Sequence, residues 1–109
     1  MTRKNLTDYY RKLFGEPAME GGCYASWDFG GNLVTVGPHD EVTGKNAQPG
    51  RMFWSILTAD ATADFERYKA AGAIVVRDLY RDKDAPQFLI ATFADPDNNY
   101  FQIVTHEKQ

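Results

Sequence analysis

Apolar residues recur at two different spacings along this chain, and each spacing predicts its own kind of element. Near the start the spacing is helical, with apolar side chains at Leu6, Tyr9, Tyr10 and Leu13. Asn5 or Thr7 can cap this predicted helix, and Gly15 ends it. A second helix is predicted after Asp60, which is a good N-cap residue, and it ends at Gly72.

The other segments alternate between apolar and polar residues, or stay apolar over a few residues, as strands do. We expect strands at 23–29, 33–36, 52–58, 73–80, 88–93 and 100–105. The residues Gly30-Gly31-Asn32 form a hairpin signal. In the strand that follows the long loop 37–51, Trp54 and Ile56 are expected to face the second helix.

The most informative segment is 93–103, in which a strand enters a turn of Asp, Pro and Asn and continues as an alternating strand. The side chains of Asp95 and Asp97 can accept hydrogen bonds from their own backbone. Either Asn98 or Asn99 can adopt a positive φ. This pattern predicts a tight and well-defined turn.

The strand after this turn has a polar residue at its centre. Alternation places Tyr100, Gln102 and Val104 on one face of the sheet, with Phe101 and Ile103 on the other. A polar side chain between apolar neighbours is where a binding pocket would place its anchoring group, so this face is the candidate site.

Composition narrows the class of protein. With 109 residues, 43% of them hydrophobic and 14% aromatic, we expect a single globular domain over residues 1–109. The net charge of −3 and the scattered basic residues argue against nucleic acid or a membrane surface as a partner. No apolar run approaches the ~20 residues of a membrane span. The single cysteine, Cys23, cannot form an internal disulfide, so a cytoplasmic location is expected.

The two predicted helices resemble each other. Residues 8–15 and 64–72 both begin with Asp, have an aromatic residue next and an Arg three positions on, and end in Gly. Because each also leads into strands, we infer a duplication. One module covers about residues 1–45 and the other about residues 51–109.

Four segments resemble the vicinal oxygen chelate superfamily, which includes glyoxalase I, bleomycin-resistance proteins, fosfomycin-resistance enzymes and extradiol dioxygenases. They are residues 9–15, 57–60, 70–76 and 94–102. The last is the most specific, and it departs from the superfamily's Asp-Pro-Asp-Gly-Asn only by Asn98 in place of Gly. The resemblance implies an α+β fold of paired βαβββ modules around a cup, usually in a dimer.

The superfamily's first strand, which precedes the first helix, is missing from this sequence. Either the start is truncated, or another chain covers the sheet edge that the absent strand leaves. An uncovered edge promotes association, because its backbone donors and acceptors are unpaired. We therefore expect a homodimer.

The resemblance also identifies the positions at which metal-binding relatives carry ligands. The first lies on the missing strand, the second falls at or near Phe53, and the third is Gln102, where those relatives usually carry Glu. An apolar ring cannot bind a metal ion, and a neutral amide is a weak ligand. We therefore expect no metal and no cofactor.

Five residues are the ligand-binding candidates. They are Gln102 as a polar anchor, Phe53 and Trp27 as an aromatic wall, Tyr100 beside Gln102, and Arg51 as a partner for an anionic group. Each also has a plain interpretation as a core or surface residue.

Other residues compete for these roles. If the opposite face of strand 23–29 lines the cup, Tyr24, Ser26 and Asp28 replace Trp27, and the sequence leaves this open. Residues 39–41, His-Asp-Glu, are either an acid–base group or an exposed turn.

The preferred hypothesis is a metal-free protein that holds a small organic molecule in the cup, in the manner of the drug-sequestering relatives. The first alternative is a metal-dependent lyase, isomerase or dioxygenase, with Gln102 and either His39 or Glu41 as ligands. The second is a non-catalytic interaction module. The sequence identifies neither a catalytic residue nor a ligand.

Overall fold

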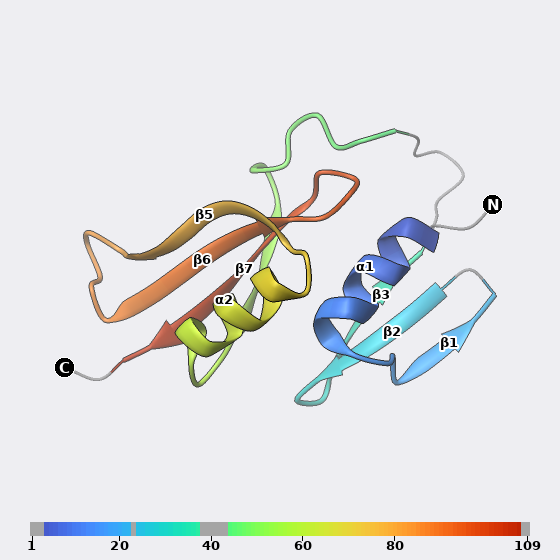
Figure 1. The fold of residues 1–109 in the computed structure, drawn as a ribbon, viewed down its shortest axis with the longest axis horizontal. Coiled ribbons are helices and arrows are strands. Elements are labelled where there is room, and N and C mark those ends of the chain that lie inside the picture. Colours follow the sequence, from blue (N-terminus) through green and yellow to red (C-terminus); the bar gives the residue numbers. More distant parts are fainter. Residues whose placement is uncertain (1–3, 23, 38–43, 108–109) are drawn as a thin grey trace.

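The computed structural model describes residues 4–22, 24–37 and 44–107 (Figure 1). Its elements are α1 (Lys4–Phe14), β1 (Met19–Gly21), β2 (Tyr24–Phe29), β3 (Asn32–Val36), β4 (Phe53–Leu57), α2 (Ala61–Ala70), β5 (Ile74–Arg81), β6 (Phe88–Ala94) and β7 (Tyr100–His106). The α+β class and both predicted helices are confirmed, and each predicted strand has a counterpart. The short strand β1 was not predicted, because its three residues, Met-Glu-Gly, are all exposed and show no alternation.

The strands form two sheets. The first has the order β1-β2-β3 and is antiparallel throughout. The second has the order β4-β7-β6-β5, in which β4 runs parallel to β7 and the other neighbours are antiparallel. A helix followed by three consecutive strands therefore occurs twice, and only the second set has a strand before its helix within the described residues. This is the paired βαβββ arrangement without the first strand.

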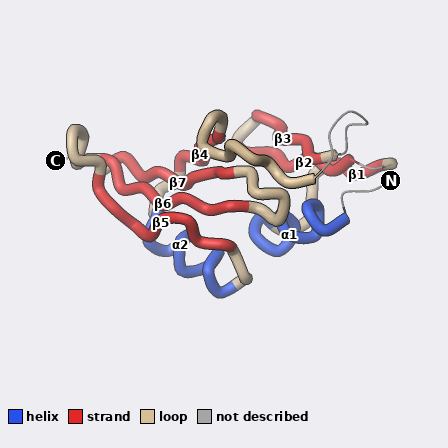
Figure 2. The backbone as a smooth tube through the Cα atoms, turned by 90° about the horizontal axis from the view of Figure 1, so that it is seen from above, coloured by secondary structure: helices blue, strands red, loops and turns tan. Residues whose placement is uncertain are grey.

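Both helices lie on the same side of the strands (Figure 2), and the core fills the space between them. The largest fully buried side chains come from α1 and from the two central strands of the second sheet: Leu13, Phe93, Phe101 and Ile103. The rings of Phe93 and Phe101 stack with centroids 5.3 Å apart. We call the side of the sheets away from the helices the open face.

The turns follow from local sequence. Gly30 and Gly31 have φ values of 67° and 100°, which glycine adopts without strain, so the predicted hairpin is confirmed. Asp60 caps α2, because its Oδ1 accepts a hydrogen bond from the Ala63 N–H at 3.0 Å. The predicted cap of α1 is wrong, since that helix begins at Lys4 and includes both Asn5 and Thr7.

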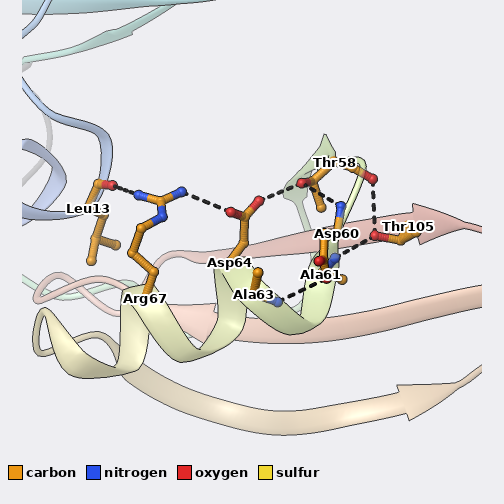
Figure 3. Close-up of polar contacts among 8 residues, drawn as sticks. All are labelled: Leu13, Thr58, Asp60, Ala61, Ala63, Asp64, Arg67 and Thr105. Carbon is orange, nitrogen blue, oxygen red and sulfur yellow. Dashed lines mark hydrogen bonds and ion pairs between the residues drawn. The ribbon is translucent and has the colours of Figure 1, made fainter.

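A chain of polar contacts connects α2 with its sheet and with α1 (Figure 3). Thr105 Oγ1 on β7 accepts a hydrogen bond from the Ala61 N–H at 2.6 Å. Asp64 accepts hydrogen bonds from Thr58 and from Arg67. The same Arg67 guanidinium donates to the carbonyl oxygen of Leu13 at 3.1 Å, so it links the two helices.

Helix α1 also bonds to the second sheet. The Tyr9 hydroxyl donates to the carbonyl oxygen of Ala94 at 2.6 Å and accepts a hydrogen bond from the Ile74 N–H at 2.9 Å. The ring of Trp54 on β4 lies 6.3 Å from Tyr10 and 6.0 Å from Phe14, both on α1. Trp54 also stacks on Phe101 of β7, with ring centroids 5.4 Å apart, and so it faces the helix layer. The helix that its ring contacts is α1, which corrects the expectation that it faces the second helix.

Candidate functional site

Three rows of side chains cross the open face of the four-stranded sheet, because the register aligns residues that point the same way. The first apolar row is Phe53, Tyr100, Ala94 and Ile74. The polar row is Ser55, Gln102, Thr92 and Arg77. The second apolar row is Leu57, Val104, Ile90 and Tyr80. The face therefore presents one line of hydrogen-bonding groups between two apolar lines.

Gln102 lies at the centre of the polar row. Its neighbours Phe101 and Ile103 are fully buried on the helix side, which confirms the alternation predicted for this strand. Its Nε2 donates to Ser55 Oγ at 2.9 Å. The amide oxygen makes no hydrogen bond within the described residues, so it is available to a donor on the open face.

A groove runs between the neighbouring edges of β3 and β4. One end is a hollow of about 420 Å³ next to the first apolar row, lined by Leu6, Tyr10, Val34, Thr35, Val36, Gly37, Met52, Phe53, Trp54, Asp95, Asn99 and Tyr100. The other end is a hollow of about 520 Å³, lined by Phe29, Gly30, Asn32, Val34, Trp54, Ser55, Ile56 and Leu57. Most of the lining side chains are apolar, which is typical of a small-molecule site.

Two polar residues at the first hollow, Asp95 and Asn99, are already engaged with each other. The carboxylate of Asp95 is 3% exposed and accepts hydrogen bonds from the N–H groups of Asp97 and Asn99, both at 2.9 Å. The Asn99 side chain also donates to it. Asn98 has a φ of 64°, so of the two asparagines it is the one with a positive φ. Asp95 therefore shapes the turn and has little capacity left for a ligand.

Tyr10 joins the first helix to this turn. Its hydroxyl donates to Asp95 Oδ2 at 2.6 Å in a buried position. Burial, followed by the negative charge of Asp95, raises the pKa of the Tyr10 hydroxyl well above its usual value. The hydroxyl is therefore a permanent hydrogen-bond donor and is not suited to act as a base near neutral pH.

The structure places Trp27 away from the open face. Trp27 is 3% exposed on the helix side, and its Nε1 donates to the carbonyl oxygen of Gly15 at 2.8 Å. This corrects the expectation that Trp27 lines the cup with Phe53. The opposite phase of β2 carries Tyr24, Ser26 and Asp28, of which Ser26 is buried. Ser26 Oγ lies 2.8 Å from Thr35 Oγ1, so these two hydroxyls bond each other.

The remaining candidates are only partly brought together. Phe53 and Tyr100 are in register on the open face, beside Gln102 in the next row. Arg51 lies outside the rows, where its Nη1 donates to Gln48 Oε1 at 3.2 Å in an exposed loop. Cys23 and residues 39–41 lie outside the described residues.

One open-face residue was missed from the sequence, namely Arg77. Strand β5 has register shifts on both sides of this residue, between Val75 and Arg77 and between Arg77 and Tyr80. Such irregularities break the period of two, so alternation alone does not reveal which face a residue occupies. The only sequence signal is the charged pair Arg77-Asp78 inside an otherwise apolar run.

The positions that the superfamily uses for metal ligands do not fit a divalent ion here. Phe53 offers no donor atom, and Gln102 offers only the oxygen of a neutral amide, which is a weak metal ligand. Within residues 4–22, 24–37 and 44–107, no three His, Cys, Asp or Glu side chains come close enough to hold a metal ion. A transition-metal ion such as Zn²⁺ needs three or four such ligands.

Comparison with known proteins decides the family. A model of the glyoxalase-like domain matches residues 2–104. This chain belongs to the glyoxalase-like domain family of the vicinal oxygen chelate superfamily. No curated protein matches the chain significantly.

Solved structures share the fold of this glyoxalase-like chain. A glyoxalase/bleomycin resistance protein/dioxygenase from Alicyclobacillus acidocaldarius is 18% identical, with a TM-score of 0.73 over 96% of this chain and 83% of its own. A glyoxalase-related enzyme from Fulvimarina pelagi is 20% identical, with a TM-score of 0.73 over 94% and 79%. TioX from Micromonospora sp. ML1 is 22% identical, with a TM-score of 0.66 over 99% and 90%. At these identities the likeness shows the glyoxalase-like fold alone.

Proposed function

We propose that this glyoxalase-like chain binds a small organic molecule, without a metal ion, where the groove meets the first apolar row. The observation that supports this most is the hollow of about 420 Å³ beside Phe53 and Tyr100. Its size lies in the range of small-molecule sites, roughly 300–1,000 Å³. Phe53 is 53% exposed, so its ring can contact a ligand without any rearrangement of the core.

The polar groups around this hollow favour a mainly apolar ligand. Asp95 and Asn99 bond each other, and Thr35 bonds Ser26. The Tyr100 hydroxyl at the hollow and the Gln102 amide oxygen in the next row of the open face make no hydrogen bond within the described residues, and they supply a small number of directional contacts. Binding therefore depends on shape and apolar contact, with two polar groups fixing the orientation.

A thermal-shift screen tests this proposal with aromatic, cationic and antibiotic compounds. A ligand that binds only the folded state raises the melting temperature, and the shift grows with the logarithm of the ligand concentration above its dissociation constant. Phe53→Ala is expected to abolish the shifts. Met19→Ala is the matched control, since Met19 is 56% exposed on β1 and lies away from the groove. If no compound raises the melting temperature at high concentration, the proposal fails.

Elemental analysis of the purified protein tests the metal-free part separately. We expect less than about one metal ion per ten chains, because the described residues offer no adequate ligand set. A near-stoichiometric content of Zn, Ni, Mn or Fe would favour the alternative of a metal-dependent lyase, isomerase or dioxygenase.

We also propose that the chain forms a homodimer. Within the described residues β3 pairs only with β2, and β4 only with β7, so each has a free edge. Exposed apolar side chains lie on these strands, with Leu33 at 52% and Leu57 at 76%. Unpaired edges of this kind promote association. Light scattering is expected to give twice the chain mass, and Leu33→Lys, which changes no residue that lines the groove, is expected to give monomers. A monomer for the unmodified chain would refute this. A cytoplasmic location, which rests on the single cysteine, stays a prediction.

A further inference from the structure

Arg77 is the only charged residue in the three rows, and it makes no hydrogen bond or ion pair within the described residues. The other described arginines all bond an oxygen atom: Arg11 to Glu16 and Glu20, Arg51 to Gln48, Arg67 to Asp64, and Arg81 to Glu107. Arg77 instead stacks on Tyr80, with its Cζ 3.5 Å from the ring centroid. Its N–H donors are therefore free to bind an anion from outside the chain.

The stacking prepares Arg77 for this role. A guanidinium lying on an aromatic ring keeps its plane fixed, which reduces the entropy lost when a carboxylate binds it with two hydrogen bonds. Tyr80 is half-buried, and its partner in the row, Ile90, is 8% exposed, so the cation lies on an apolar surface. The neighbouring carboxylate of Asp78 accepts a hydrogen bond from the Leu79 N–H at 2.6 Å.

The register defines the rest of the ligand. Arg77 on β5 lies two strands and one row from Tyr100 on β7, which corresponds to roughly 12 Å between their backbone positions. Thr92 and Gln102 occupy the polar row between Arg77 and Ser55, and both carry hydrogen-bonding groups. A molecule that spans this distance places an apolar body on the first apolar row and an anionic end at Arg77.

We propose that the ligand is an elongated aromatic acid, with its rings against Phe53 and Tyr100 and its carboxylate on Arg77. This inference rests on the proposed function and gives it a chemical class. It also replaces Arg51 by Arg77 as the partner of the anionic group, because Arg51 lies outside the rows and bonds Gln48. The net charge of −3 disfavours an anion over the molecule as a whole, so the attraction for an anion comes from the local positive charge of Arg77.

Calorimetric titration of the full chain with three probes of one shape tests this class. The probes are biphenyl-4-carboxylate, its neutral carboxamide and the cationic biphenyl-4-methylamine. We expect the carboxylate to bind about tenfold more tightly than the carboxamide, as one charge-assisted hydrogen-bonded pair provides. The amine is expected to bind most weakly. Added salt should weaken the binding of the carboxylate and leave the binding of the carboxamide unchanged.

Two matched variants locate the charge. In Arg77→Gln the ratio of the carboxylate affinity to the carboxamide affinity should fall to nearly one. The affinity for the carboxamide should stay within about twofold of its value in the unmodified chain. Arg51→Gln removes the same charge elsewhere and should preserve the preference. Melting temperatures of both variants are measured as well, and since both arginines are exposed we expect little change.

The outcomes separate the two proposals. If the carboxamide binds as tightly as the carboxylate, the acid class is overturned while the small-molecule site stands. Equal effects of Arg77→Gln and Arg51→Gln would also overturn it, since the preference would then follow net charge. If none of the three probes binds, both the acid class and the apolar site are rejected for molecules of this shape.

Discussion

Asp95 and Gln102 are polar residues of one turn-and-strand segment, yet their surroundings are opposite. Asp95 is 3% exposed, and its oxygens accept hydrogen bonds from a tyrosine hydroxyl, two backbone N–H groups and an asparagine side chain. Gln102 lies on the open face, donates one hydrogen bond to Ser55 and keeps its amide oxygen available. The hydrogen-bonding capacity of Asp95 is used up within the chain, whereas that of Gln102 is not.

This difference distinguishes a residue that stabilises the fold from one that is available to bind a ligand. A buried carboxylate with every oxygen engaged stabilises the fold, because removing it leaves several donors without partners. A half-exposed amide with spare capacity contributes little to stability and can exchange its partner for a ligand. The most distinctive motif of the sequence, Asp95-Pro96-Asp97, is therefore a folding device, and the proposed binding groups stand beside it.

The largest expected effect comes from Asp95→Ala. This substitution leaves the Tyr10 hydroxyl and the N–H groups of Asp97 and Asn99 without their acceptor. We expect a loss of about 3 kcal/mol in the free energy of unfolding, measured by urea denaturation. Asp95→Asn keeps the shape and should lose less. A cost below that of ordinary surface substitutions would contradict the structural role of the carboxylate.

Tyr10→Phe removes a single donor from the same cluster and is expected to rank second. The lost hydrogen bond to a carboxylate should cost about 2 kcal/mol in the free energy of unfolding. Tyr100→Phe is the matched control, because the Tyr100 hydroxyl makes no hydrogen bond within the described residues. We expect that variant to change stability by less than about 0.5 kcal/mol. Equal costs for the two variants would remove the distinction between the cluster and the open face.

The stability of the natural chain and that of Tyr10→Phe should depend differently on pH. Burial raises the folded-state pKa of Tyr10 above the ordinary value of 10.0. The stability from the neutral hydroxyl is thus complete below pH 10 and is lost as the pH rises further, because only the unfolded chain then releases the proton. Above pH 10 the free energy of unfolding should fall more steeply for the natural chain than for Tyr10→Phe.

Asn98 tests the turn with a smaller effect. Its φ of 64° is strained for a residue with a Cβ, and its Nδ2 donates to the Asn46 carbonyl oxygen at 2.9 Å. We expect Asn98→Ala to cost about 1 kcal/mol, because alanine is poorly suited to this φ and loses the hydrogen bond. Asn98→Gly, which restores the usual superfamily residue, should cost less. If both variants have the same stability, φ is not the constraint.

Much of the fold could be predicted because its signals are local. Gly30-Gly31, Asp60 and the alternation around Gln102 each act within a few residues, and the structure confirms them. The site depends on non-local register, which the sequence does not encode so directly. Trp27 was expected in the cup because strand phase was open, and Arg77 was missed because two register shifts flank it.

Gln102→Leu gives the smallest change in stability and is the sharpest test of the comparison. The lost contact is one exposed hydrogen bond to Ser55, and leucine suits a sheet between two apolar rows, so the free energy of unfolding should change by less than about 0.5 kcal/mol. Ser55→Ala removes the same hydrogen bond but keeps the amide, and its stability should match. Binding of biphenyl-4-carboxylate should weaken about fivefold in Gln102→Leu alone, because only that variant removes the amide oxygen that is available to a ligand, whereas Ser55 lies at the end of the polar row away from Arg77. If Gln102→Leu instead destabilises the chain as much as Asp95→Ala does, the amide is a structural group and the two residues do not differ in kind.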